Sequence, residues 1–430
     1  VLAALSPTYA FSFLCGHFTV AFFSLAAVVL AVTGAEALYA DMGHFGKRPI
    51  RLAWFSLVLP ALLLNYFGQG ALVIESAAGA ENPFYLLAPR IMLYPLIILA
   101  TAAAVIASQA LISGAFSLTQ QSVQLGYSPR VNIIHTSGEE AGQIFVPEVN
   151  GALMIGCLVM VLAFRSSNAL SAAYGIAVTG TMVITTILFA ELARLKWNWR
   201  PIQYISFAVF FLAIDLAFFA ANVLKIEHGG WVPLAIGGAI FVLMTTWHRG
   251  RRITRMLLHN ATLPLDDVID SITKHKVTRV PGTAVFMTAD SSGAPMVLLH
   301  HLKHNKVLHE EVVLLTVRVK EIPDVAECDR VAVTELTEGF WRVVAQYGFM
   351  QTPDVPGILR LAAKDHGVCV HPMDTTYYLG REWLLPIGNT NFAQWRKRLF
   401  AFMSRNSSPA TEFFNLPPNR VIELGAQLEI

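Results

Sequence analysis

The chain has 430 residues, of which 55% are hydrophobic and 14% are charged, and its mean hydropathy is +0.53. Globular domains are about 25% charged, so this composition indicates a protein that lies at least partly in a membrane. The net charge of +2 gives no basic surplus for nucleic acid. The cysteines (Cys15, Cys157, Cys328 and Cys369) form no CxxC pair, which argues against a disulfide or zinc framework.

Charged residues are spread unevenly along the chain. Twenty of the 60 lie in residues 1–247, and the other 40 lie in the last 183 residues. This shift predicts a transmembrane domain over residues 1–247 and a cytoplasmic α/β domain over residues 248–430.

Seven transmembrane spans are expected, because a span needs about 20 largely apolar residues. The first residue is Val1 rather than Met, and an odd number of spans is awkward for a transporter built from paired repeats, so we expect an N-terminally truncated chain. The expected spans cover residues 18–40, 52–74, 91–117, 147–164, 168–190, 202–224 and 230–247.

The basic residues of the short loops predict the orientation. Three segments on the same side of seven alternating spans are rich in Lys and Arg, namely residues 42–51, residues 191–201 and the stretch after residue 247. The C-terminal domain is therefore expected on the cytoplasmic side. The long polar loop 118–148 suggests no chemistry of its own.

The stretch VLAVTGAEALYADMGHFG, residues 29–46, combines a breakable helix with a carboxylate. Thr33-Gly34 is a place where a helix can unwind, and Glu36 follows two residues later. A carboxylate inside a span costs about 3 kcal/mol and usually serves a partner or a pathway. The pattern predicts one wall of a cation site, with Glu36 at an interfacial helix end as the alternative. Asp41 lies nearer the loop and is expected to pair with a loop cation, while Tyr39 is a secondary candidate.

Two later spans also contain polar positions. Tyr174 and Thr179 lie in AAYGIAVTGTMVITT, where simple helix packing explains most of the small and hydroxyl residues. Asp215 lies well inside an expected span, which fits a functional role or a structural partner but not exposure to lipid.

The C-terminal half alternates strand and helix patterns, as expected of a small α/β domain. It contains no GxGxxG, GxxxxGK[ST] or GxSxG motif, so a regulatory or dimerisation module is favoured over an enzyme. The histidine cluster has no HExxH pattern and is rich in Lys, which favours a solvated helix face over a metal site. Its members are His300, His301, His304 and His309.

Long stretches of the chain resemble the KUP/HAK/KT potassium uptake permeases. They include GAEALYADMGHFGKRPIRLAWF, LNYFGQGAL, VIASQALISGAFSLTQQSVQLGY, SSNALSAAYGIAVTGTM and RVPGTAVFMT. The resemblance implies a twelve-span permease of the amino-acid/polyamine/cation superfamily with LeuT-type inverted repeats, of which this chain would hold the last seven spans. It implies potassium uptake coupled to protons in the cytoplasmic (inner) membrane, with no cofactor and a possible homodimer through the cytoplasmic domain.

The resemblance also implies roles for single residues. Thr33 would give oxygen to the ion, Glu36 would be the essential carboxylate, and Tyr174 would line or gate the pathway. Asp215 also matches the pattern. An amino-acid permease of the same superfamily and a membrane-anchored sensor or interaction protein remain as alternatives.

Overall fold

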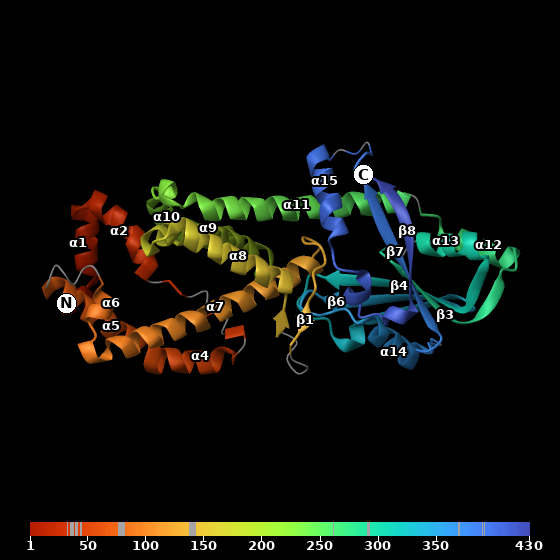
Figure 1. Cartoon of the computed structure of the whole chain (residues 1–430), viewed down its shortest axis with the longest axis horizontal. Coiled ribbons are helices and arrows are strands. Elements are labelled where there is room, and N and C mark those ends of the chain that lie inside the picture. The colour runs from red at the N-terminus through yellow and green to blue at the C-terminus, as the bar shows by residue number, and fades with distance from the viewer. Residues whose placement is uncertain are drawn as a thin grey trace. The chain divides into compact units, whose positions relative to one another are not determined.

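The computed structural model describes residues 1–31, 33–34, 38, 42–43, 45–75, 82–136, 143–260, 262–289, 293–368, 370–388, 390 and 392–430. The chain forms two compact units (Figure 1). The first contains residues 1–114 and 151–239, and the second contains residues 115–150 and 240–430. The predicted boundary at residue 247 stays a prediction, but the second unit includes the polar loop for which the sequence suggested no role.

The first unit is helical. Its short helices are α1 (Pro7–Gly16), α2 (Phe18–Ala31), α4 (Lys47–Ala53) and α6 (Pro83–Leu86). Its longer helices are α5 (Leu59–Glu75), α9 (Ser167–Leu195), α10 (Pro201–Val223) and most of α8 (Pro147–Phe164). The helices α7 (Leu93–Gln124) and α11 (Trp231–Asn260) run through both units.

Six helices of the described residues are long and apolar enough to cross a membrane. They coincide with six of the seven expected spans and cover Lys47–Glu75, Arg90–Gln124, Pro147–Phe164, Ser167–Leu195, Pro201–Val223 and Trp231–Asn260. The expected first span, residues 18–40, begins as the shorter apolar helix α2 and continues into residues that the structure only partly describes.

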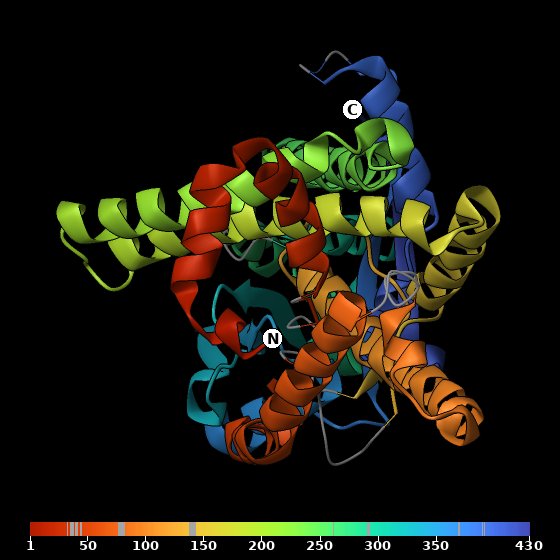
Figure 2. The same ribbon diagram turned by 90° about the vertical axis from the view of Figure 1, so that its left-hand side faces the viewer.

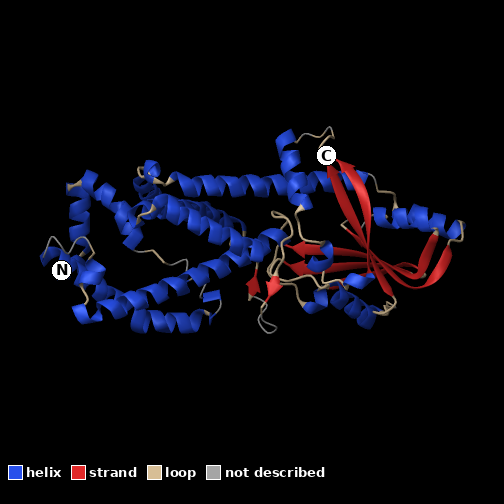
Figure 3. Cartoon of the chain, viewed as in Figure 1, coloured by secondary structure: helices blue, strands red, loops and turns tan. Residues whose placement is uncertain are grey.

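The second unit is built on a six-stranded sheet (Figure 3). The strands lie in the order β5-β6-β4-β3-β7-β8, all parallel except the edge strand β5. They are β3 (Thr278–Thr288), β4 (Val307–Lys320), β5 (Val331–Thr337), β6 (Phe340–Gly348), β7 (Thr375–Leu385) and β8 (Val421–Glu429).

Helices cover both faces of this sheet, because its central strands bury side chains in both directions. Val285 and Val313 point to the face of α14 (Val355–His366). Phe286 and Leu314, one position further along, point to the face of α12 (Leu265–Lys274) and α13 (Met296–Asn305). Strands buried on both faces are typical of parallel α/β sheets, as the alternating pattern predicted.

The helices α15 (Gln394–Arg405) and α16 (Ala410–Phe413) and the short strands β1 (Ile134–His135) and β2 (Ile144–Phe145) complete this unit. Its polar loop is fixed to the ends of two candidate spans by aromatic contacts. The rings of Phe116 on α7 and Phe145 meet edge to face at 5.7 Å, and Tyr127 stacks on His248 of α11 at 4.6 Å.

Candidate ion-binding site

The helix α2 ends at Ala31, where the sequence predicted a break. The hydroxyl of Thr33 turns back and donates to the carbonyl of Leu30 at 2.8 Å. Gly34 has φ of +106°, a left-handed conformation that favours glycine. The last carbonyls of a helix have no partner within the helix, so this end presents oxygen atoms to its surroundings.

A second helix helps to satisfy this end. Tyr66 on α5 donates its hydroxyl to the carbonyl of Ala31 at 2.9 Å. A threonine hydroxyl, a tyrosine hydroxyl and the carbonyls of Leu30 and Ala31 therefore gather at the break. Rings of such neutral oxygens replace the hydration shell of potassium in selective pores.

Close packing joins α2 to α9 and α10 in the same unit (Figure 2). Gly175 on α9 lies so near Asn222 on α10 that an added Cβ would overlap the Asn222 side chain. Thr179, fully buried one turn later, donates to the carbonyl of Gly175 at 2.7 Å. Small residues that let helices approach closely are typical of membrane helix pairs.

Asp215 on α10 is buried in this helix pair, and Thr186 on α9 donates its hydroxyl to Asp215 Oδ2 at 2.6 Å. Asn222 lies seven residues further along α10, so both side chains lie on the face toward α9. Its Oδ1 is buried without a hydrogen-bond partner. The α9–α10 contact thus contains a carboxylate with one hydroxyl donor and an amide oxygen that still lacks one.

The predicted site residues have different outcomes. Thr33 lies just after the end of α2, and Asp215 is buried between α9 and α10. Tyr174 lies on α9 and is 38% exposed. Glu36, Tyr39 and Asp41 lie outside the described residues, so their proposed roles stay predictions.

The four histidines differ in burial: His301 is buried, His304 is exposed, and His300 and His309 are half-buried. The rings of His300 and His304 stack at 5.9 Å on the outer face of α13. His301 is 3% exposed, and burial and the nearby His309 lower its pKa, while burial also lowers the pKa of His309. Among the described residues, no group of three or more His, Cys, Asp or Glu is arranged to hold a metal.

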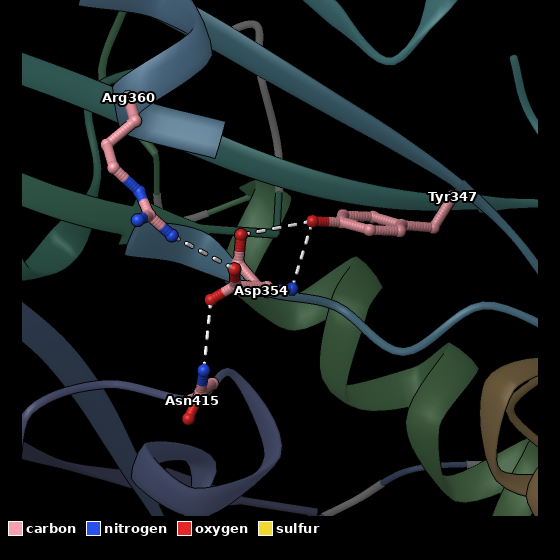
Figure 4. A network of polar contacts seen from close by, with 4 residues as sticks. All are labelled: Tyr347, Asp354, Arg360 and Asn415. Carbon is pink, nitrogen blue, oxygen red and sulfur yellow. Dashed lines mark hydrogen bonds and ion pairs between the residues drawn. The ribbon is translucent and has the colours of Figure 1, made fainter. Parts of the chain in front are cut away.

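A polar network at the carboxyl end of β6 holds the loop 349–354 (Figure 4). Asp354 accepts a hydrogen bond from Asn415 at 3.1 Å and faces Arg360 at 3.8 Å. The Asp354 N–H donates to the Tyr347 hydroxyl at 2.9 Å, and that hydroxyl lies 3.1 Å from the Asp354 carbonyl. Burial raises the pKa of Tyr347, which therefore stays a neutral donor and acceptor. A cavity of about 370 Å³ adjoins the network.

The end of α7 binds this loop through amide side chains. Gln120 and Gln124 are both buried, and their Nε2 atoms lie 3.5 Å from the Thr352 hydroxyl and 3.3 Å from the Gln351 carbonyl. His135 adds a contact of 3.0 Å to the same hydroxyl. The loop 349–354 therefore attaches the end of the candidate span α7 to the six-stranded sheet of the second unit (hereafter the sheet unit).

Sequence reasoning missed several of these residues. Asn222 and Thr186 were not predicted as site residues. Each lies seven residues after a polar residue on its own helix, Asp215 and Thr179 respectively, and this spacing places both members of a pair on one helix face. Gln120 and Gln124 gave no such signal, because their partners are more than 220 residues away in the chain.

Comparison with known proteins identifies the family. Residues 1–252 match the model of the K⁺ potassium transporter integral membrane domain. The chain belongs to this family. Residues 281–430 match the K⁺ potassium transporter C-terminal domain, which confirms the resemblance to the KUP/HAK/KT permeases in both halves. The family consists of transporters, not enzymes.

Curated bacterial relatives of the chain support the same family. The probable potassium transport system protein Kup of Anaeromyxobacter dehalogenans (strain 2CP-C) is 55% identical over the whole of this chain, which covers 65% of that protein. The corresponding protein of Myxococcus xanthus is 54% identical with 66% covered, and Kup 2 of Chromobacterium violaceum is 54% identical with 69% covered. The chain thus spans about two thirds of the length of these relatives.

Proposed function

We propose that this protein takes part in potassium uptake across the cytoplasmic (inner) membrane, as a potassium–proton symporter that works by alternating access. The observation that carries the proposal is the end of α2 at Ala31, followed by Thr33-Gly34, in a region that matches the integral membrane domain of potassium transporters. Transporters of the LeuT type bind coupling ions at such discontinuous helices.

The proposed site combines neutral oxygens with one carboxylate. Thr33 and the carbonyls at the end of α2 supply oxygen, and Glu36 balances the charge of the bound ion. Tyr174 lines or gates the pathway. Asp215 is a secondary candidate, whose bond from Thr186 at 2.6 Å fits a supporting position as well as a coupling one.

The basic loops support a cytoplasmic position for the C-terminal domain. The alternation of spans places loop 118–148 on the same side as that domain, and the structure packs loop and domain into one unit. A homodimer through this domain rests on the resemblance alone. The comparisons give no support to an amino-acid permease.

The direct test is rubidium uptake by cells that lack other potassium uptake systems and express the gene product carrying this chain. Glu36→Gln is expected to abolish uptake at low external potassium, because the bound ion loses its counter-charge. The matched control is Glu191→Gln, which removes a half-exposed carboxylate paired with Arg194 at 3.2 Å. Unchanged uptake by the Glu36 variant at equal expression, across the external potassium range, would refute its role.

A further inference from the structure

The helix α15 carries an exposed apolar ridge bordered by arginines. Trp395 and Phe402 are 54% and 61% exposed and lie two turns apart on one face, with the half-buried Leu399 between them. The exposed Arg398 and Arg405 lie along one side of this ridge. Trp, Phe and Leu on one face with Arg beside them is the pattern of a helix that lies in a membrane interface.

The opposite face of α15 fixes the helix at a defined level of α11. Phe400, 1% exposed, lies against Trp247 at 5.3 Å between ring centres. The Phe400 ring also packs on Gly250, where an added Cβ would overlap it. The middle of α15 is therefore level with residues 247–250 of α11.

This is the level at which α11 leaves the apolar layer. The uncharged part of α11, residues 231–247, is about 25 Å long at 1.5 Å per residue, close to the roughly 30 Å of a hydrocarbon core. The first charged residue of α11 is Arg249. Trp247, at the end of this part, is of a residue type enriched at membrane–water interfaces.

The direction of α15 agrees with a position in the membrane plane. Figures 1 and 2 differ by a turn about the vertical axis, and α15 stands upright in both, while α11 lies along the horizontal in Figure 1. The two helices therefore cross steeply. With α11 through the bilayer, α15 runs along its surface.

We propose that α15 is an interfacial helix that inserts Trp395 and Phe402 into the inner leaflet and binds anionic lipid headgroups through Arg398 and Arg405. Two observations favour lipid over a protein partner: α15 is anchored to α11 at Trp247 and Gly250, where the uncharged part of that candidate span ends, and its arginines complement the negative inner leaflet. The proposal depends on α11 being a span and on the proposed cytoplasmic position of the C-terminal domain, not on potassium as the cargo.

The test measures immersion depth by spin labelling of the whole chain in nanodiscs. A label is attached at Phe402→Cys, in a background without the native Cys15, Cys157, Cys328 and Cys369. The control label is at Met373→Cys, which is 73% exposed and lies just before the amino end of β7. Leu384, near the other end of this strand, packs against the Phe400 cluster, so the two labels are separated by about 30 Å of strand.

We expect the label at 402 to be more accessible to oxygen than to a water-soluble nickel complex, and the label at 373 to show the reverse. Arg398→Gln with Arg405→Gln is expected to reduce the depth at 402 in bilayers with anionic lipid and to have little effect in zwitterionic bilayers. Nickel accessibility at 402 equal to that at 373 would overturn the proposal. Shielding of 402 from both reagents would also overturn it, because a protein surface would then cover the helix.

Discussion

The side chain of Gln351 holds the loop 349–354, which contacts the end of α7. Its Oε1 accepts from the backbone N–H groups of Gly348 at 2.8 Å and Val325 at 3.2 Å, and its Nε2 donates to the Val325 carbonyl at 3.1 Å. Gln351→Ala removes all three bonds. At about 0.5–1.5 kcal/mol each, the local free energy of opening is expected to fall by roughly 1.5–4.5 kcal/mol.

Hydrogen exchange of the detergent-solubilised chain measures this loss. A fall of about 3 kcal/mol corresponds to roughly 150-fold faster exchange of the amides near 325 and 348–354, because each 1.4 kcal/mol is a factor of ten. Gln121→Ala is the matched control, since Gln121 faces the same loop through one exposed contact of 3.4 Å with the Met350 sulfur. Its effect is expected to stay within about 0.5 kcal/mol. Equal effects of the two substitutions would refute the reasoning.

Three further predictions concern other parts of the chain. Phe400→Ala should free α15 at a cost of about 3–5 kcal/mol, because the ring is fully buried, and protease cleavage within α15 would report it. Thr186→Val should lower the stability of the solubilised protein by about 1–2 kcal/mol through loss of the donor to Asp215, whereas Thr186→Ser should stay close to wild type in a thermal melt. Because burial lowers the pKa of His301 and His309, the unfolded chain binds more protons below the ordinary pKa of 6.5. Stability of the sheet unit should therefore be complete above that pH and fall as the pH drops below it. The double variant His301→Gln with His309→Gln should make the free energy of unfolding less dependent on pH. An unchanged slope of that free energy against pH would contradict the assignment of this dependence to the two histidines.

The elements that sequence predicted well are those with strong local patterns. Long uncharged stretches gave six spans, and the strands at the centre of the sheet gave continuous apolar runs such as Val312 to Val319. The strand β8 was missed, because an edge strand is covered on fewer sides and its sequence, VIELGAQLE, alternates only weakly.

In the candidate site, too, the sequence predicted local features but not contacts between separate helices. The break at Thr33-Gly34 is a local property of threonine and glycine, so the sequence predicted it. The bond from Tyr66 to Ala31 and the pair of Thr186 with Asp215 depend on how separate helices pack, which a single sequence does not encode in any local pattern. The resemblance supplied roles for residues, but not these partners.

The attachment of α7 and α11 to one sheet has a mechanical consequence. The end of α7 is held at the loop 349–354, and α11 is held by an ion pair of 2.8 Å between Arg251 and Glu382 on β7. These contacts therefore tie the ends of two candidate spans to the same sheet. Among the described residues, α7 is attached to the loop through the neutral amides of Gln120 and Gln124, whereas α11 is attached through an ion pair. A signal that loosens the loop 349–354 would free α7 while α11 stays fixed.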